Sequence, residues 1–418
     1  MKMINVAITE ASYSGNKGAA AMLQSSIAQL RKRYGEDLQI YIFSVWPKAD
    51  TELISRDYIH VVPAEAWKTV FVAFPMAVLY RLFRWCAPVR NRLLQNRMLE
   101  AYSRMDMVLD EAGVSFVDSR GFVMNTFAFI CMAIPLLLGV PVVKYSQAMG
   151  SFQKLPNRIQ AKIILPRMKL ILARGELTRK YLERLGIRKN VRVCADGAFT
   201  MEDDPVIDRR VEEACSKDAF FSGRNIVGIS PSTVVNKKCK KAKIDYVRIM
   251  ADFIDQLTDE GYQVLILANA AREHTAKTRN NDLPICRKIV QRCRNKAHIR
   301  FIDREMCPEE IRAYAGKCRF FVSSRFHAMI FALERKVPVL LIGWSHKYQE
   351  VLDDFELGKF ATDFSDLSAE SMLEGFHRLV EAEEEIHGKL DRNYDKVMES
   401  SRRNIKYASE VLDAVLRK

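Results

Sequence analysis

The sequence contains few of the residues that mark disordered, fibrous or low-complexity chains. Only 18 glycines and 13 prolines occur in 418 residues, while 49% of the residues are hydrophobic and 28% are charged. This composition is typical of globular proteins and excludes collagen-like and disordered classes. Because the chain exceeds the usual size of one domain, we expect two domains, each large enough to bury its own core.

Metal-binding and disulfide spacings are also missing. None of the nine cysteines forms a C-x-x-C pair, and none of the seven histidines forms H-x-x-x-H or H-E-x-x-H. These absences argue against a zinc site and against a disulfide framework. We therefore expect reduced, mostly buried thiols, and neither a metal nor a cofactor.

The first residues lack the long apolar core of a secretory signal. They resemble a β-strand instead, so we expect a cytoplasmic protein. The formal net charge of +14 favours an anionic partner, which can be nucleic acid, an acidic membrane or a phosphorylated substrate. Because no RNP-like, helix-turn-helix or zinc-finger pattern is found, we expect no nucleic-acid partner.

Strand-like and helix-like segments alternate along the chain, which predicts an α/β fold with parallel sheets. We expect one Rossmann-like domain over residues 1–200, a second over 220–380, and a helical extension over 381–418 whose end can pack back across the domain joint. The predicted strands are 4–9, 38–45, 107–109, 140–145, 170–173, 191–194, 226–230, 262–268, 299–302, 319–322 and 338–342.

Residues 67–98 do not match a simple strand or core helix. An uncharged stretch, 69–80, is followed by several arginines. Twelve residues are too few to span a bilayer, which needs about 20. Two interpretations remain open: an amphipathic helix that lies in a membrane interface, with arginines on anionic headgroups, or a buried helix with an exposed basic end.

The strongest candidate site is the segment Ser323-Ser324-Arg325-Phe326-His327. An apolar strand ends in two serines and passes directly into a helical pattern, so the polar residues lie where open α/β sheets bind ligands. Arg325 can contact phosphate or carboxylate, and His327 can move a proton near neutral pH. We expect both side chains at the rim of a cleft.

Weaker candidates lie near other strand ends. Ser230 ends the first strand of the second domain, His274 follows the next strand, and Asn16 with Gly18 forms the first loop. The backbone N–H groups of that loop can bind an anion, although a simple tight turn fits the pattern equally well.

The sequence also resembles the polysaccharide pyruvyl transferase family over nearly its whole length. The resemblance is carried by an ordered set of segments: Asn16-Lys17-Gly18, Arg174-Gly175-Glu176-Leu177-Thr178, Ala195-Asp196-Gly197-Ala198-Phe199, the loop from Asn269 through His274 to Asn281-Asp282, Ser323-x-Arg325-x-His327-Ala328, Val337-Pro338-Val339 and His346-Lys347-Tyr348. It departs from the family at 109–118, where several glycines of a turn are missing.

This resemblance implies a GT-B-like fold, with two Rossmann-like domains facing a cleft, and transfer of a pyruvyl group from phosphoenolpyruvate to a sugar as a ketal. The sugar would belong to a cell-surface polysaccharide (an exopolysaccharide) or to its lipid-linked precursor. Arg325, Arg174 and Lys347 would bind the anionic donor, and His327 would move protons or bind phosphate. Asp118 or Glu111 would act as base on the acceptor side.

Two other functions fit the same residues. A GT-B glycosyltransferase or sugar-nucleotide epimerase would use the Arg325 and His327 pair on a nucleotide diphosphate. A non-catalytic scaffold at the membrane surface would rest on residues 67–98 and on the missing glycine turn. The first alternative differs in its ligand, and the second predicts that His327 is dispensable.

Overall fold

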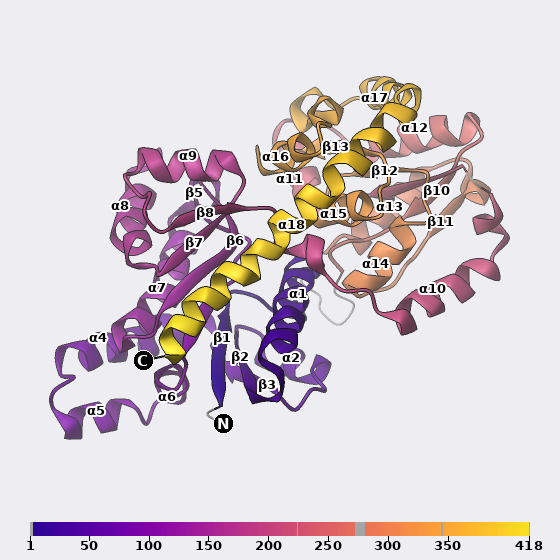
Figure 1. The fold of residues 1–418 in the computed structure, drawn as a ribbon. Coiled ribbons are helices and arrows are strands. Elements are labelled where there is room, and N and C mark those ends of the chain that lie inside the picture. The colour runs from indigo at the N-terminus through magenta and orange to yellow at the C-terminus, as the bar shows by residue number, and fades with distance from the viewer. Residues whose placement is uncertain (1–2, 224, 272–280, 344–345, 418) are drawn as a thin grey trace. The chain divides into compact units, whose positions relative to one another are not determined.

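The computed structural model describes residues 3–223, 225–271, 281–343 and 346–417, the side chains of 346 and 347 excepted. Within these ranges the chain divides into two compact units, each built on a parallel sheet (Figure 1). The first unit comprises Met1–Gly15, Met22–Met201 and Glu399–Lys418, and the second comprises Asn16–Ala21 and Glu202–Met398. The predicted α/β class is therefore confirmed.

The first unit contains an eight-stranded sheet among the described residues, with the order β3-β2-β1-β4-β6-β7-β8 and with β5 paired to β6. Its strands are β1 (Ile4–Thr9), β2 (Leu38–Ser44), β3 (Ile59–Pro63), β4 (Met107–Asp110), β5 (Val114–Val117), β6 (Val142–Gly150), β7 (Leu170–Arg174) and β8 (Val191–Cys194). Its helices are α1 (Lys17–Tyr34), whose residues up to Ala21 are grouped with the second unit, α2 (Pro47–Leu53), α3 (Ala66–Lys68), α4 (Phe74–Leu82), α5 (Ala87–Leu93), α6 (Arg97–Ser103), α7 (Gly121–Leu138), α8 (Leu155–Ile164) and α9 (Glu176–Arg184).

The second unit contains a six-stranded parallel sheet in the described ranges, with the order β11-β10-β9-β12-β13-β14. Its strands are β9 (Ile226–Ser230), β10 (Gln263–Ile266), β11 (Ile299–Phe301), β12 (Phe320–Ser323), β13 (Val339–Gly343) and β14 (Ala361–Asp363). Its helices are α10 (Pro205–Ser216), α11 (Thr233–Lys241), α12 (Tyr246–Asp259), α13 (Leu283–Arg292), α14 (Pro308–Ala315), α15 (Phe326–Glu334), α16 (His346–Asp354) and α17 (Ala369–Glu381). The long α18 (Glu383–Leu416) begins in this unit, and its last turns are grouped with the first.

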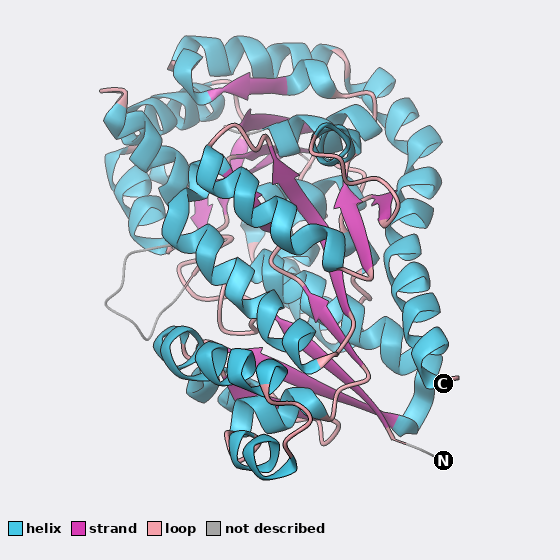
Figure 2. Ribbon diagram, turned by 90° about the vertical axis from the view of Figure 1, so that its left-hand side faces the viewer, coloured by secondary structure: helices cyan, strands magenta, loops and turns pink. Residues whose placement is uncertain are grey.

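Helices surround the strands of both sheets (Figure 2), which explains why the central strands are apolar without alternation. Every residue of β9 is buried, and only Ser230 at its end is polar. Strands covered on both faces give continuous hydrophobic runs, and the expected strands were found from such runs. The short strands β3, β5 and β14 were missed. Of these, β3 contains a proline and β14 consists of three residues, Ala361-Thr362-Asp363, at the sheet edge.

The segment 67–98 is not one continuous helix. It consists of the end of α3, a π-helical turn at Thr69–Ala73, α4 and α5, and it runs up to the start of α6. Ala73 and Ala77 are buried whereas Phe71 and Trp85 are exposed, so the segment is buried on one side only, and its contact with a membrane stays a prediction.

All nine cysteines are free thiols, and seven of them are buried. This arrangement agrees with the expectation of reduced, mostly buried thiols.

Candidate functional site

The sheet of the second unit reverses its strand order between β9 and β12. From this point β10 and β11 follow on one side, and β13 and β14 follow on the other. Ser230 at the end of β9 and Ser323 at the end of β12 are direct partners in the register. Parallel sheets bind ligands outside the carboxyl ends of their strands at such a reversal, so this edge is the natural position for a site.

The turn from β12 into α15 is fixed by Ser323. Its hydroxyl accepts the Arg325 N–H at 3.1 Å and donates to the Arg325 carbonyl at 2.7 Å. The Ser324 N–H donates to the Ser230 carbonyl at 2.9 Å, which continues the pairing by one residue. The predicted passage from strand to helix is therefore confirmed, and Arg325 occupies the N-cap position without using its side chain as a cap.

Arg325 forms a buried ion pair with Asp282, in which Nη2 donates to Oδ1. From the sequence we expected Arg325 and His327 at the rim of a cleft. In the structure both side chains are buried instead: Arg325 is 8% exposed and His327 is 9% exposed. The pKa of Arg325 is raised, because burial acts to lower it but the charge and hydrogen bond of Asp282 outweigh burial. The guanidinium therefore stays charged while it lies inside the unit.

The Asp282 carboxylate joins three segments of the second unit. Besides Arg325, its Oδ1 accepts the Thr233 N–H at 2.9 Å, and its Oδ2 accepts the Ala270 N–H at 3.0 Å. Asp282 directly precedes α13, where an aspartate is ordinarily a helix cap, but it caps no N–H of that helix. In the sequence, Asp282 stands out only as part of a longer motif, because its local pattern indicates a helix cap.

Three buried polar atoms at this edge have no hydrogen-bond partner among the described residues: Ser230 Oγ, Asn269 Oδ1 and Arg325 Nε. They come from the ends of β9 and β12 and from the residues just after β10. A buried polar group without a partner costs about 1–3 kcal/mol, so such groups normally bind a water or a ligand. The edge thus presents one cationic donor and two neutral polar groups for a polar ligand.

His327 packs against the backbone of Gly18, which belongs to the same unit. A Cβ atom added to Gly18 would lie 1.7 Å from His327 Nδ1, so no larger residue fits there. The Phe326 ring meets the imidazole edge-on, with 5.1 Å between ring centroids. These contacts give a physical reason for the first-loop motif: its glycine leaves room for the imidazole.

Asn16 acts locally in the same loop. Its side-chain oxygen accepts the Gly18 N–H at 3.1 Å, and its carbonyl accepts the Ala20 N–H at 2.9 Å. The Gly18 N–H is thus engaged by Asn16, which favours the tight-turn interpretation over an anion nest. Both residues position the start of α1 against His327.

Two candidates cannot be described fully. His274 lies outside the described residues, in 272–280, and Lys347 lies in the first turn of α16 with its side chain outside the described atoms. Among the residues that the structure does describe, no group of three or more His, Cys, Asp or Glu side chains is placed to hold a metal ion.

Arg174 lies in the first unit, at the end of β7. It forms a buried ion pair with Asp196, whose other oxygen accepts the Ala198 N–H at 2.8 Å. The Asp196 carbonyl also accepts the Ser401 hydroxyl of α18 at 2.6 Å. The two sequence segments 174–178 and 195–199 therefore meet through one ion pair.

Glu111 follows β4 directly and is completely buried. Burial raises the pKa of its carboxyl group to about 8; a nearby Ser26 hydroxyl acts to lower it, and the charge of Asp110 adds to the increase. The Ser26 hydroxyl donates its hydrogen bond to the Leu23 carbonyl at 3.0 Å, so it satisfies Glu111 poorly. A carboxyl group that is neutral at pH 7 can donate a proton more readily than accept one.

Asp118 caps a turn in the same unit. Its carboxylate accepts the Gln153 N–H at 2.9 Å, the Lys154 N–H at 3.3 Å, and the Asn157 amide at 2.9 Å. Burial acts to raise the pKa of Asp118, but these hydrogen bonds, Asn157 first, lower it below its usual value. This arrangement favours a structural role at the start of α8 over that of a base.

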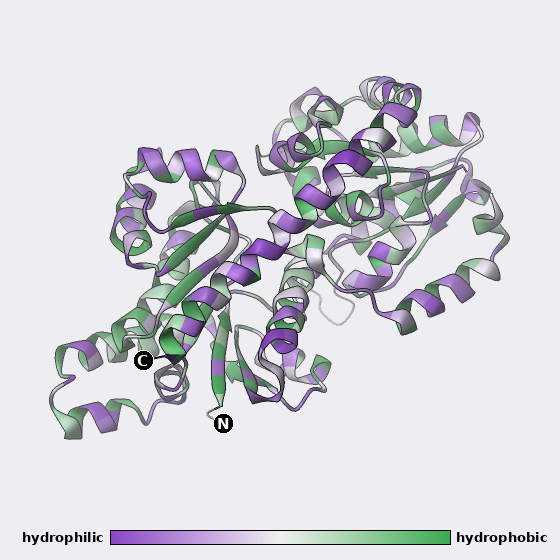
Figure 3. Ribbon diagram, viewed as in Figure 1, coloured by the Kyte–Doolittle hydropathy of each residue, from purple (hydrophilic) through white to green (hydrophobic). Residues whose placement is uncertain are grey.

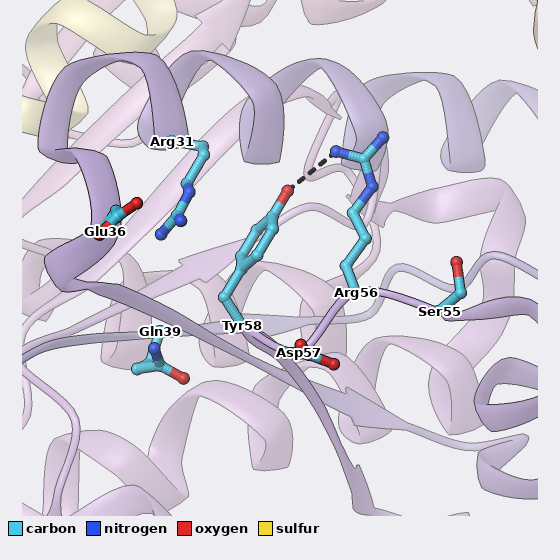
Figure 4. Close-up of a pocket in the computed structure, with 7 residues that line it drawn as sticks. All are labelled: Arg31, Glu36, Gln39, Ser55, Arg56, Asp57 and Tyr58. Atoms are coloured by element: carbon cyan, nitrogen blue, oxygen red, sulfur yellow. Dashed lines mark hydrogen bonds between the residues drawn. The ribbon is translucent and has the colours of Figure 1, made fainter.

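A hollow of about 610 Å³ lies elsewhere in the first unit, at the amino ends of β2 and β3 (Figure 4). Arg31 lies over the Tyr58 ring at 4.4 Å, and Arg56 donates to the Tyr58 hydroxyl at 3.0 Å. None of the candidate residues lines this hollow. It lies at the amino ends of the strands, whereas ligands of parallel sheets bind at the carboxyl ends, so it is not the candidate site.

A family comparison agrees with the motifs. The model of the family "Polysaccharide pyruvyl transferase" matches residues 16–346, which includes Asn16, Gly18, Arg174, Arg325 and His327.

Comparison with solved structures identifies the fold. The UDP-GlcNAc 2-epimerase from Neisseria meningitidis bound to UDP-GlcNAc has a TM-score of 0.61 at 13% identity, covering 98% of this chain and 100% of that chain. The S. aureus MnaA–UDP co-structure has a TM-score of 0.62 at 13% identity, covering 98% of both chains. A ugt transferase from Siraitia grosvenorii in complex with UDP has a TM-score of 0.54 at 12% identity, covering 99% and 100%. Such identities show the fold alone: two Rossmann-like domains of the GT-B type.

Proposed function

Because the chain belongs to the polysaccharide pyruvyl transferase family, and is thus a transferase that modifies polysaccharide, we propose that it moves a pyruvyl group from phosphoenolpyruvate to a saccharide as a ketal. The observation that carries this proposal is the corner formed by Arg325, Asp282 and His327. A buried cation and two unpartnered polar groups lie there at the carboxyl edge of a parallel sheet, and His327 lies two residues after Arg325 in the first turn of α15.

The reaction sets definite demands on such a corner. Two sugar hydroxyls each form a bond to C2 of the donor, and the bond between C2 and the phosphate oxygen breaks. One hydroxyl proton is balanced by the proton that C3 gains to become a methyl group, and the other leaves with phosphate. The enzyme must therefore hold a phosphate and a carboxylate and must relay protons.

The described residues can meet part of these demands. Arg325 Nε and the first turn of α15 can donate hydrogen bonds to an anion, and Ser230 can add a further contact. His327 can relay a proton at neutral pH or bind the phosphate. Asp282 holds the guanidinium in position, because it accepts a hydrogen bond from Nη2 and leaves Nε available for a ligand.

A second candidate is an enzyme that acts on a nucleotide sugar. The structural neighbours that bind UDP or UDP-GlcNAc favour it, because a diphosphate would also bind at the start of α15. Differential scanning fluorimetry separates the two. Stabilisation by phosphoenolpyruvate, and none by UDP, GDP or CMP conjugates, supports pyruvyl transfer, and the reverse result supports the second candidate.

We also propose a cytoplasmic location at the inner face of a membrane, and an acceptor sugar that belongs to a surface polysaccharide or to its lipid-linked precursor. We expect no further cofactor, because the enol phosphate is already an activated donor and the transfer involves no net oxidation or reduction. Purified protein incubated with phosphoenolpyruvate and candidate glycans should release phosphate in proportion to the mass gained by the glycan.

A pair of histidine variants tests the role of His327. We expect His327→Asn to lose transfer while the melting temperature changes little, because asparagine keeps a polar side chain of smaller volume. His298→Asn, on an exposed histidine of the same unit, is the control and should retain full activity. Full transfer by purified His327→Asn would end the assignment of this residue.

A further inference from the structure

The excess positive charge of the chain is confined to two segments of the first unit. Residues 66–99 contain six Lys and Arg and no Asp or Glu, and residues 119–175 contain eight Lys and Arg and no Asp or Glu. The rest of the chain therefore carries 51 basic and 51 acidic residues, so its net charge is zero. A charge this unevenly placed needs an explanation in the fold.

The first segment exposes large apolar side chains beside its arginines. Phe71 is 76% exposed and Trp85 is 78% exposed, and Trp67, Leu79, Leu82 and Phe83 are also exposed. Arg81 and Arg84 are exposed between them. In Figure 3 the region of α4 and α5 accordingly shows hydrophobic and hydrophilic residues side by side.

The second segment shows the same combination on α8. Leu155, Ile159 and Ile163 are exposed and recur every four residues, so they form one stripe along the outer side of this helix. Lys154, Arg158 and Lys162, also exposed, lie immediately before each of them. An apolar stripe that faces solvent is the reverse of the usual amphipathic pattern.

Helix α7 connects the two segments, because it packs against both α4 and α8. Asp118–Leu138 is long and apolar enough to cross a membrane by length and composition, with a mean hydropathy of 2.0. However, its middle, around Ala128 to Pro135, belongs to the core of the unit, and core helices pass the same test. Only its first turn adds to the surface, where Phe122 and Val123 are exposed.

We propose that these exposed residues of α3–α5, the start of α7 and α8, here called the basic apolar face, dock the first unit on an anionic lipid bilayer. Each Lys or Arg near an anionic membrane contributes about 1 kcal/mol, and exposed aromatic rings favour the headgroup boundary. A nucleic acid would attract the cations but would leave the isoleucines and leucines in water. A protein interface would place few charges at its centre, whereas here cations alternate with the apolar residues.

Vesicle flotation of the full chain tests this proposal. We expect the protein to float with phosphatidylcholine vesicles that contain phosphatidylglycerol, and to bind pure phosphatidylcholine about tenfold more weakly. The variant F71S/F83S/W85S should lose the apolar part of the binding, and K154E/R158E/K162E should lose the electrostatic part. Phe74 is left unchanged because it packs against the core of the unit.

The matched control is K237E/K240E/K241E, which reverses three exposed lysines of α11 in the second unit. It changes the net charge as much as the α8 variant does, so retained flotation shows that position and not charge number matters. Equal flotation of all variants, or equal loss in the control, overturns the proposal. Self-association of the chain that F71S/F83S/W85S abolishes, without flotation, would assign the face to a second copy instead.

This inference stands apart from the proposed reaction, because flotation requires no donor and no acceptor. The variants of the basic apolar face leave the corner around Arg325 unchanged. They should therefore transfer to a soluble saccharide at the normal rate, and a protein that floats but transfers nothing would contradict the reaction alone.

Discussion

The backbone of Gly18 lies directly against the imidazole of His327, and a single added carbon would lie 1.7 Å from Nδ1. Residues 309 positions apart in the sequence are thus held in contact by the absence of a side chain. The contact places a segment from the start of the chain beside the helix that carries the proposed proton carrier, so the geometry of His327 depends on it.

Gly18→Ala should therefore displace His327. We expect transfer to fall about 100-fold or more, since a shift of about 1 Å in a catalytic group has effects of this size. Phosphate release from phosphoenolpyruvate measures the loss. Gly15→Ala is the matched control, because its added Cβ would meet Ser12 at an ordinary 3.4 Å. Unchanged transfer by Gly18→Ala would mean that the imidazole can move without consequence.

Asp282→Asn should destabilise the protein by about 3–5 kcal/mol, because it leaves the buried Arg325 cation without its counter-charge. The free energy of unfolding in urea measures the change. Asp259→Asn, in an exposed ion pair with Arg294, should change it by no more than about 0.5 kcal/mol. Adding Arg325→Met to Asp282→Asn should restore part of the loss, and a purely additive double variant would argue against the pair.

Glu111→Gln should stabilise the protein at alkaline pH. The unfolded carboxyl group ionises near 4.5, whereas the folded one keeps its proton up to about 8. Between these pH values the native state binds more protons than the unfolded state. The free energy of unfolding therefore falls by up to about 1.4 kcal/mol for each unit by which the pH rises. Glutamine removes this dependence.

Unfolding at pH 5 and pH 8 tests the Glu111 prediction. The gain from glutamine should be a few kcal/mol at pH 8 and much smaller at pH 5. A smaller slope should remain in the variant, because burial also raises the pKa of Glu10, to about 7. If the free energy of unfolding depends on pH in the same way in the original chain and in Glu111→Gln, then Glu111 is already ionised in the native state.

Asp118→Asn distinguishes a structural role in the turn before α8 from the role of a base. As a hydrogen-bonded carboxylate with a lowered pKa, Asp118 stabilises the native state above its unfolded pKa, and this contribution disappears as the pH falls through the folded value. We expect the variant to be less stable at pH 7, equal in stability at strongly acidic pH, and still active in transfer. Loss of transfer with unchanged stability would assign Asp118 to the reaction.

Much of the fold could be read from the sequence. The runs at Ile4–Thr9, Val191–Cys194 and Ile226–Ser230 have the bounds that were predicted. For Ile226–Ser230 the reason is that a strand buried on both faces is apolar without alternation. Helix α14 begins at Pro308, because a proline in the first turn of a helix costs no hydrogen bond, and Glu310 accepts the Cys307 N–H at its start. The turn that carries Arg325 and His327 was also found, since strand, serine pair and helix follow each other without a gap.

Other features depend on residues that are distant in sequence and could only be decided by tertiary packing. Asp282 has the sequence position of a helix cap, yet its carboxylate binds Arg325 because the turn after β12 brings the guanidinium beside it. Leu155, Ile159 and Ile163 have the spacing of a core stripe, yet they face solvent because the opposite side of α8 packs on α7. The sequence by itself thus determined most of the strands, the family and the candidate corner, since local apolar runs and motifs carry them. The tertiary structure decided which charges are paired and which apolar residues remain exposed, because partner and neighbour come from distant segments.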